Sequence, residues 1–251
     1  LNLLMEKQCN LVVNWMRVGF VHGVMNTDNM TISGQTIDYG PCAFMDHYDA
    51  KTVFSSIDKF GRYSFSNQPK ITKWNLARFA ECLIPLIDQN EDSAIKKASD
   101  VVDNFEKIYE KKWLNMMRDK LGLFGEDKED KKLINDLLNW MELNKIDYTN
   151  TFCYLMNIKT PEINCYKSNE FMHWTDRWKK RLNVKEISSS KYLDLMRISN
   201  PIVIPRNHKV EEALIAANEN NLELLKNLLT VLENPYNDQK NILDYQCPLP
   251  I

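Results

Sequence analysis

The sequence predicts a mainly helical fold that contains a single β-hairpin. Apolar residues recur at helical spacing along most of the 251 residues, and this period is the main signal for amphipathic helices. Only one short stretch, residues 30–37, surrounds a Ser-Gly turn in the way that a hairpin requires. Glycine is scarce, with 7 residues in the whole chain, and four of these lie within residues 19–40. The composition is that of a globular protein, because 44% of the residues are hydrophobic and 26% are charged.

The expected elements follow each other in a simple order. A first helix over residues 1–19 ends at Gly19, and the hairpin follows after a short polar stretch. Residues 41–68 show no clear period, so we expect a long ordered loop there. From Pro69 onward the pattern predicts helices over residues 70–86, 92–121, 133–143, 147–157, 168–182, 189–198, 208–219 and 221–233. The tryptophans at helical spacing are expected in the core: Trp74, Trp113, Trp140, Trp174 and Trp178.

Several classes of protein are excluded or disfavoured by the sequence. The chain has neither a G-x-G-x-x-G nor a G-x-x-x-x-G-K-[ST] loop, which argues against a free-standing Rossmann or P-loop enzyme. A net charge of −2 gives no reason to expect nucleic acid as a partner, and no apolar run approaches the roughly 18 residues of a membrane span. The six cysteines are widely spaced without a C-x-x-C pair, which favours a reducing compartment over a zinc site or a disulfide scaffold.

The stretch between residues 22 and 40 contains the residues best suited to chemistry. It runs from His22 through Asn29 and the expected hairpin to a D-Y-G triplet that begins at Asp38. The C-lobe of a protein kinase has the same order: a helix, an H-x-D-x-x-x-x-N catalytic loop, a hairpin and a D-F-G triplet. Asn29 lies seven residues after His22, as that loop requires, and Asp38 follows nine residues later. We therefore expect the side-chain oxygens of Asn29 and Asp38 to bind Mg²⁺ on the phosphates of a nucleotide.

One position in this loop departs from the kinase pattern. The catalytic aspartate of H-x-D falls at Val24, and a valine can neither accept a proton nor orient a hydroxyl. Another carboxylate, that of Asp28, stands directly before Asn29 and is the candidate acid/base group. His22 itself is expected to brace the backbone of the loop rather than to take part in the chemistry.

Longer motifs carry a more specific resemblance. The run HGVMNTDNMTISGQTIDYGP over residues 22–41, followed by GRYSFSNQP and WNLARFA, is similar to the selenoprotein O family, as is NPIVIPRNH over residues 200–208. The resemblance covers about residues 15–235. It implies a kinase-fold protein adenylyltransferase. Members of this family bind ATP in a flipped orientation and transfer AMP, not the γ-phosphate, to Ser, Thr or Tyr hydroxyls of proteins.

The resemblance also implies roles for three residues. Asp28 matches the catalytic proton acceptor of the family, Asn29 and Asp38 match its Mg²⁺ ligands, and Asp38 also meets the ATP. The implied cofactor is Mg²⁺, or Mn²⁺ in its place, and the implied partners are ATP and proteins with hydroxyl side chains. Neither nucleic acid nor a membrane is expected as a partner. The implied location is the cytoplasm for a bacterial protein and the mitochondrion for a eukaryotic one.

The expected fold is thus a mainly α, protein-kinase-like C-lobe with one β-hairpin at the metal site and extra C-terminal helices. Residues 1–90 are expected to form the core of the lobe with the catalytic loop and the D-Y-G segment, and residues 91–251 a helical extension of the same domain. The N-lobe of the family, with its glycine-rich loop, is not expected within this chain. Redox control is not expected either, since the terminal cysteine or selenocysteine motif of the family is missing, and the sequence alone does not decide whether Cys42 pairs with Cys247.

Two alternatives to an adenylyltransferase stay open at this point. One is a kinase-like phosphotransferase that moves the γ-phosphate, against which Val24 argues. The other is a catalytically inactive helical interaction fragment, because a chain without the phosphate loop of the N-lobe is expected to bind ATP weakly. Arg62 is expected either to contact an anion or a protein substrate or to fix its own loop, whereas Arg206 is expected to be a structural tie.

Overall fold

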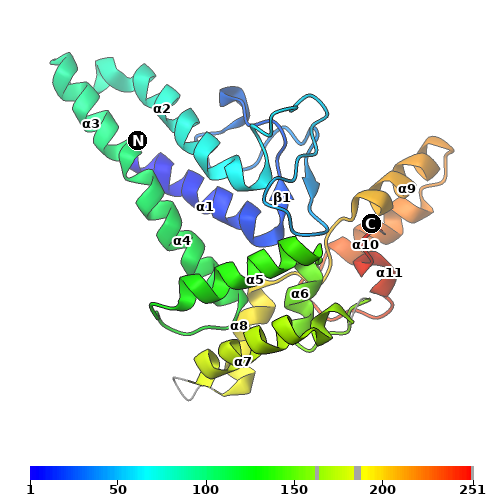
Figure 1. The fold of residues 1–251 in the computed structure, drawn as a ribbon. Helices are drawn as coiled ribbons and strands as arrows, with labels where there is room; N and C mark the ends of the chain where they lie inside the picture. The colour runs from blue at the N-terminus through cyan, green and yellow to red at the C-terminus, as the bar shows by residue number, and fades with distance from the viewer. Residues whose placement is uncertain (162–163, 184–187, 250–251) are drawn as a thin grey trace. The chain divides into compact units, whose positions relative to one another are not determined.

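The computed structural model describes residues 1–161, 164–183 and 188–249, and within them the architecture is mainly helical (Figure 1). The α-helices are α1 (Asn2–Val18), α2 (Gln68–Ile87), α3 (Glu91–Asp103), α4 (Phe105–Lys120), α5 (Asp130–Asn144), α6 (Tyr148–Leu155), α7 (Asn169–Asn183), α8 (Ser189–Ser199), α9 (Asn207–Asn218), α10 (Glu223–Leu232) and α11 (Leu243–Gln246). The 3₁₀ helices are η1 (Thr27–Asn29), η2 (Phe65–Asn67) and η3 (Cys165–Lys167). The strands β1 (Phe20–Val21) and β2 (Ala43–Phe44) pair in a two-stranded sheet. The prediction of a mainly helical fold is confirmed.

The predicted hairpin at residues 30–37 is present only in a reduced form. One antiparallel bridge joins Met30 to Thr36. The Gly34 N–H donates to the Thr31 carbonyl at 3.2 Å and closes the turn, and the Thr31 hydroxyl lies 2.7 Å from the Ser33 hydroxyl. The strands that do pair, β1 and β2, are too short to leave an alternation that a sequence pattern can detect.

The single helix predicted over residues 92–121 is in fact two helices, α3 and α4, which are separated at Asn104. The Asn104 backbone N–H donates to the Val101 carbonyl, and its side-chain amide donates to the Asp100 carbonyl, each at 3.2 Å. These local bonds compete with the regular helical ladder and end α3. The short helix α11 lies in the proline-containing tail, where the sequence pattern predicts no helix.

The chain folds into two compact units whose segments alternate along the sequence. The first unit comprises Leu1–Met16, Phe20–Ala43 and Ala50–Asn115, and the second comprises Arg17–Gly19, Phe44–Asp49 and Met116–Ile251. The predicted site, residues 22–40, lies entirely in the first unit. The division into residues 1–90 and 91–251 stays a prediction, since it concerns family-specific parts rather than compactness.

The first unit is held together by the apolar faces of its helices. A buried cluster joins α1, α2 and the start of α4 through Met5, Cys9, Leu76 and Phe105. A second cluster joins α2 to α3 through Ala80, Ala98 and Val102. Two of these three side chains are alanines, and small side chains let two helix axes approach closely. This frame places α2 against η1, which carries part of the predicted site.

The second unit has an aromatic core in which most of the predicted tryptophans take part. Trp140, Trp174 and Trp178 are buried, and the indole nitrogens of Trp174 and Trp178 donate to the carbonyls of Leu133 and Leu121 at 2.8 and 2.9 Å. These three predictions are confirmed.

The other two of the five tryptophans predicted for the core, both in the first unit, are not core residues. Trp113 is only partly buried. Trp74 is 42% exposed, because its ring stacks against the guanidinium groups of Arg62 and Arg78 instead of packing inside the unit.

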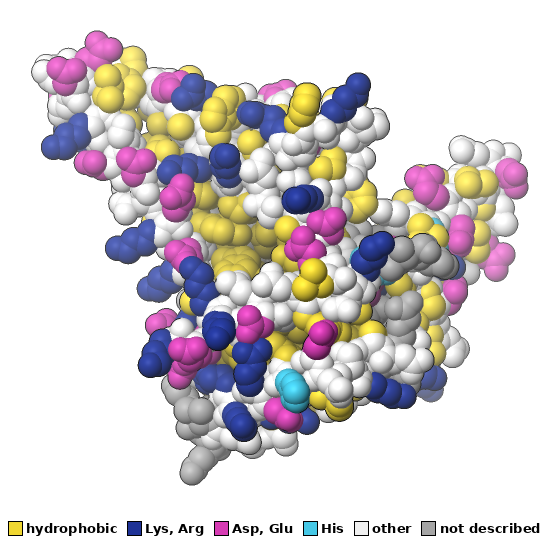
Figure 2. Space-filling view, in the orientation of Figure 1, with side chains coloured by type: hydrophobic (Ala, Val, Ile, Leu, Met, Phe, Trp, Pro, Cys, Tyr) yellow, Lys and Arg dark blue, Asp and Glu magenta, His cyan; other side chains and the backbone are white. Residues whose placement is uncertain are grey.

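Charged side chains of both signs are spread over the face drawn in Figure 2, in keeping with the net charge of −2. None of the helices in the described part of the chain combines the length and the apolar character that a membrane crossing requires.

A buried arginine joins distant segments of the second unit. Arg206 is 1% exposed, and its Nη1 donates to Asp46 Oδ1 and Asp147 Oδ2, each at 2.6 Å. Its Nη2 donates to the Gln246 carbonyl at 2.8 Å. The prediction that Arg206 is a structural tie is confirmed.

A buried carboxylate in the same unit has two arginine partners. The Asp130 side chain accepts hydrogen bonds from Arg118 Nε and Arg181 Nε at 2.7 Å each, and from the Asp127 backbone N–H at 2.9 Å. Burial raises the pKa of the Asp130 carboxyl, but these hydrogen bonds outweigh burial and hold that pKa below its usual value.

We predict that Arg206→Ala lowers the free energy of unfolding by about 3–5 kcal/mol, because it leaves Asp147 buried without its counter-charge. Urea denaturation followed by circular dichroism measures this loss. Arg177→Ala is the matched control, since Arg177 pairs with Asp136 at 2.7 Å on the surface and exposed ion pairs contribute about 0–1 kcal/mol. Equal losses in the two variants would contradict the prediction.

The pKa of Asp130 predicts a pH dependence of stability. Its folded-state pKa lies below the unfolded value of about 3.9, so its contribution is present above that value and is lost as the pH falls through the folded pKa. We expect Asp130→Asn to be less stable than the wild type at about pH 7, and the difference to shrink progressively below about pH 4. Urea denaturation across this pH range measures the difference, and a constant value would refute the assignment.

Candidate functional site

A buried histidine joins the two parts of the predicted site. His22 is 1% exposed. Its Nε2 lies 2.8 Å from the Ile37 carbonyl oxygen, and its Nδ1 lies 3.4 Å from the Val24 backbone nitrogen. The neutral tautomer with its hydrogen on Nε2 satisfies both contacts, because Nε2 then donates and Nδ1 accepts. His22 therefore ties the start of the predicted catalytic loop to the segment that leads into Asp38, and the prediction that it braces the backbone is confirmed.

Gly23 lets the loop pass close to the segment that follows the D-Y-G triplet. Its φ of +85° lies in the left-handed region, which residues with a side chain rarely adopt. A Cβ atom at this position would lie 2.9 Å from the Pro41 carbonyl oxygen, which is too close for such a contact. Residue 23 must therefore be glycine, both for its backbone conformation and for the approach of Pro41.

Two buried amide side chains of α2 form hydrogen bonds to the backbone at the start of the loop. The Gln68 side-chain oxygen accepts the His22 backbone N–H, and its nitrogen donates to the Phe20 carbonyl, both at 3.0 Å. The Asn75 nitrogen donates to the Met25 carbonyl at 2.9 Å. Sequence reasoning missed both amides. The available signal is a pair of polar residues two helical turns apart on the buried face of an amphipathic helix.

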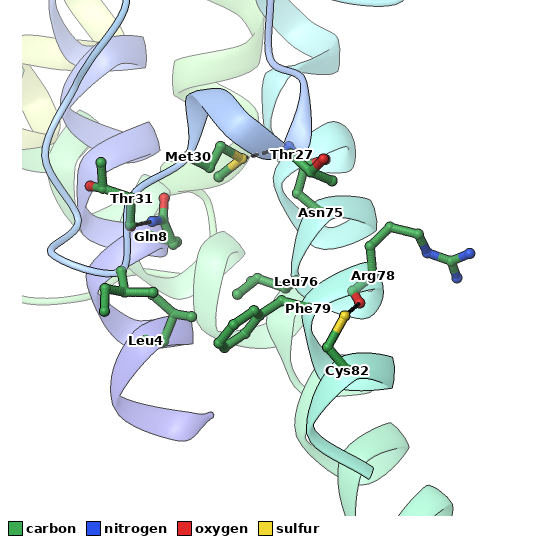
Figure 3. Close-up of a pocket in the computed structure, with 11 residues that line it drawn as sticks. Leu4, Gln8, Thr27, Met30, Thr31, Asn75, Leu76, Arg78, Phe79 and Cys82 are labelled. Carbon is green, nitrogen blue, oxygen red and sulfur yellow. Dashed lines mark hydrogen bonds between the residues drawn. The ribbon is translucent and has the colours of Figure 1, made fainter. Parts of the chain in front are cut away.

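A cavity of about 230 Å³ lies behind the loop, between α1, α2 and residues 27–32 (Figure 3). In Figure 3, apolar side chains of α1 and α2 face each other across it, and Gln8 lies beside Thr31. The Gln8 amide nitrogen donates to the Thr31 carbonyl at 2.6 Å and so holds the segment that follows η1. The cavity is lined by residues that support the loop and not by the three predicted site residues.

The 3₁₀ helix η1 presents Asp28 and Asn29 at consecutive positions. The Asn29 backbone N–H donates to the Asn26 carbonyl at 3.0 Å, which closes the turn. The Asn29 side-chain nitrogen donates to the Val24 carbonyl at 3.0 Å, which leaves the amide oxygen as the atom able to bind a cation. Asp28 is exposed to solvent. This turn thus offers one carboxylate and one oriented amide oxygen.

Asp38 has an uncommon backbone conformation. Its φ of +55° is in the left-handed region, which aspartate tolerates better than most residues. The Gly40 N–H donates to the Asp38 carbonyl at 2.8 Å, and the Asp38 side chain is exposed. Strained backbone of this kind clusters at functional sites. His22 binds the carbonyl of Ile37, the residue before Asp38. The buried imidazole therefore fixes the position of the backbone from which the Asp38 side chain extends.

The donor chemistry of Asn29 and Asp38 fits Mg²⁺. Both side chains offer hard oxygen ligands, and Mg²⁺ is commonly held by one or two protein ligands together with substrate phosphates and water. The described residues contain no group of three or more His, Cys, Asp or Glu side chains placed to bind a metal ion. The roles of Asn29 and Asp38 as ligands stay a prediction.

The six cysteines, all within the described ranges, are free thiols. Burial raises the pKa of the Cys42 thiol, and the nearby Asp38 carboxylate raises it further. A protonated thiol is a poor nucleophile, so the structure favours an inert Cys42 next to the site. The sequence alone leaves open whether Cys42 pairs with Cys247, and in the structure both are free thiols.

Comparison with known proteins identifies the family. A family model described as "Protein adenylyltransferase SelO" matches residues 1–233. The chain belongs to this family. The resemblance to selenoprotein O that the motifs predict is therefore confirmed, and the matched residues include the whole of the predicted site.

The chain is also similar to curated bacterial proteins over nearly its whole length. It is 62% identical over 252 residues to "Protein nucleotidyltransferase YdiU" of Pelagibacter ubique, covering 100% of this chain and 52% of that protein. It is 52% identical over 251 residues to the protein of the same name from Nitrosococcus oceani, covering 99% and 50%. It is 51% identical over 251 residues to the protein of that name from Clostridium botulinum, strain Eklund 17B, and the alignment covers 100% of this chain and 51% of that protein. The chain thus spans about half the length of the curated relatives it matches.

We predict that His22→Ala loosens the backbone of the site without unfolding the first unit. The substitution removes the contacts to Val24 and Ile37, and the loss of a buried hydrogen-bonding group costs about 1–3 kcal/mol. Hydrogen exchange of peptides that cover residues 20–40, followed by mass spectrometry, should accelerate by about 5- to 100-fold, while exchange in α3 stays unchanged.

Asn14→Ala serves as the control for His22→Ala, because it removes only an exposed side-chain bond to the Asn10 carbonyl of α1. Asn14→Ala should leave exchange in residues 20–40 unchanged. The same result for His22→Ala would contradict the role of His22 as the brace.

Proposed function

We propose that this chain contributes the catalytic loop and the metal-binding segment of a protein adenylyltransferase, which transfers AMP from ATP to hydroxyl side chains of proteins. The observation that supports this most strongly is the His22 tie, which connects the loop leading to Asp28 and Asn29 with the segment of Asp38. Membership of the SelO family supports the nucleotide chemistry. Because the curated relatives are about twice as long as this chain, the activity is proposed for the whole protein.

In this proposal Asp28 accepts the proton of the attacking hydroxyl. The hydroxyl oxygen forms a bond to the α-phosphorus of ATP while the bond from that phosphorus to pyrophosphate breaks. Pyrophosphate leaves with the electron pair, and the AMP remains on the protein. The exposure of Asp28 on η1 supports this role, because a hydroxyl on another protein must be able to reach it.

Asn29 and Asp38 are proposed to hold Mg²⁺, or Mn²⁺ in its place, and Asp38 also to meet the ATP. When bound, such a cation neutralises charge on the phosphates. Asn29 suits this role because its amide nitrogen is already bound to the Val24 carbonyl, which orients the oxygen. Val24 also disfavours the kinase alternative, because a kinase loop carries its catalytic aspartate at this position.

The partners and the location follow from the same proposal. ATP and a protein are the two substrates that the family description supports, and Ser, Thr or Tyr hydroxyls are the proposed acceptors. The three relatives named above are bacterial. Of the two predicted locations, the cytoplasm and the mitochondrion, the cytoplasm is therefore the proposed one.

We predict that, in the full-length protein, Asp38→Ala and Asp28→Asn each lower the rate of AMP transfer by about 100-fold or more, because they remove a metal ligand and the proton acceptor. Transfer is measured with ATP labelled at the α-phosphate, by counting label on protein. Asp100→Ala, an exposed aspartate on α3, is the control and should transfer at the wild-type rate.

A parallel sample with ATP labelled at the γ-phosphate distinguishes the alternatives. Label from the α position alone supports AMP transfer, whereas label from the γ position alone would identify a phosphotransferase. No label from either position would favour an inactive interaction module. Undiminished transfer by Asp38→Ala, with an unchanged melting temperature, would overturn the metal assignment.

A further inference from the structure

A cleft of about 580 Å³ lies on the first unit, between the loop of residues 57–63 and the start of α2. We call it the loop–α2 cleft, and its main lining side chains are Ile57, Lys59, Phe60, Arg62, Lys70 and Trp74. Binding pockets in proteins commonly enclose about 300–1,000 Å³. The cleft therefore has room for side chains of a partner.

The loop–α2 cleft is basic. Lys59, Arg62 and Lys70 line it, and Asp58 is the one acidic residue that lines it in the described part of the chain. The Asp58 carboxylate accepts the backbone N–H groups of Arg62 at 2.8 Å and Tyr63 at 2.7 Å, so its oxygens are engaged by its own loop. Within the described ranges, no acidic side chain forms an ion pair with the three cations. Their charge is thus available to an acidic partner.

Apolar side chains beside these cations are unusually exposed. Phe60 is 98% exposed and Ile57 80% exposed. The Arg62 guanidinium lies 4.9 Å from the centre of the Trp74 ring, and this stacking holds the planar cation while its N–H groups can still bind a carboxylate. Aromatic side chains and arginine are enriched where proteins bind each other. The surface therefore suits a partner that is both acidic and apolar.

The loop–α2 cleft is connected to the proposed catalytic turn. Tyr63, which lines the cleft, donates its hydroxyl to Asn26 Oδ1 at 2.7 Å. Asn26 directly precedes η1, the turn that carries Asp28. A partner segment bound in the cleft is therefore held next to the turn with the proposed proton acceptor.

From these observations we propose that the loop–α2 cleft binds an acidic segment of the protein substrate that also carries a large apolar side chain. Its carboxylates pair with Lys59, Arg62 and Lys70, and its apolar side chain covers Phe60 and Trp74. The inference rests on the proposed function for the identity of the partner as the substrate. It adds a substrate class, namely hydroxyl residues near Asp or Glu and a large apolar residue.

The test measures binding apart from turnover. Full-length protein without ATP is titrated into a fluorescein-labelled peptide that contains two glutamates, a phenylalanine and a serine, and into the same peptide with glutamine for glutamate. Fluorescence anisotropy should show about tenfold tighter binding of the acidic peptide, and added salt should reduce the difference. The double variant Lys59→Glu with Lys70→Glu should bind the acidic peptide about tenfold more weakly than the wild type.

Lys96→Glu is the matched control, because Lys96 is an exposed lysine on α3 of the same unit and does not line the cleft. It should bind the acidic peptide like the wild type. In the transfer assay, the double variant should raise the KM of the acidic peptide while kcat stays unchanged.

Failure of this inference and failure of the proposed function give different results. Equal affinity for the two peptides, or unchanged affinity in the double variant, would overturn the inference even if AMP transfer occurs. A wild-type protein that binds the acidic peptide with the expected pattern but transfers no AMP would refute the proposed function and retain the cleft as a binding site for acidic segments.

Discussion

The imidazole of His22 is the contact on which the geometry of the predicted site depends. It can serve the Val24 N–H and the Ile37 carbonyl at once because a neutral imidazole is both an acceptor and a donor. Gln68 in turn holds the backbone of His22 to α2. Exposed residues such as Asp28 thus take their positions from buried ones. Asp28 and Asp38 are exposed, whereas His22 and Gln68, which hold the backbone of the loop, are buried.

Buried polar groups join sequence-distant segments in the second unit as well. Arg206 connects Asp46, Asp147 and the Gln246 carbonyl, which belong to three well-separated parts of the chain. Apolar packing is non-directional, so it can hold helices together without fixing which backbone groups meet. Directional bonds from one guanidinium or one amide fix that choice. Both units therefore combine apolar helix faces with a few buried polar side chains that form hydrogen bonds to distant segments.

The sequence predicts the parts of this structure that repeat or that depend on spacing. Helices such as α2 and α5 are readable because one apolar stripe recurs over several turns. The order of His22, Asn29 and Asp38 can be recognised because it matches the spacing of a kinase catalytic loop and its D-F-G triplet. The break at Asn104 is not readable, since it comes from one side chain that competes for backbone carbonyls.

Contacts between distant segments leave still less trace in the sequence. Gln68 and Asn75 look like ordinary polar residues until the loop that they bind lies against them. Trp74 has a helical spacing typical of the core, but no pattern in the sequence shows that Arg62 and Arg78 cover its ring.

The nitrogen and the oxygen of the Asn29 amide have different partners, and this limits the total charge of the predicted metal site. The nitrogen donates to the Val24 carbonyl, so only the oxygen remains for a cation. An aspartate of the same size would bring a second acceptor toward that carbonyl, where neither oxygen could donate. The loop thus favours a neutral side chain at residue 29, which leaves Asp38 as the anionic one of the two predicted ligands.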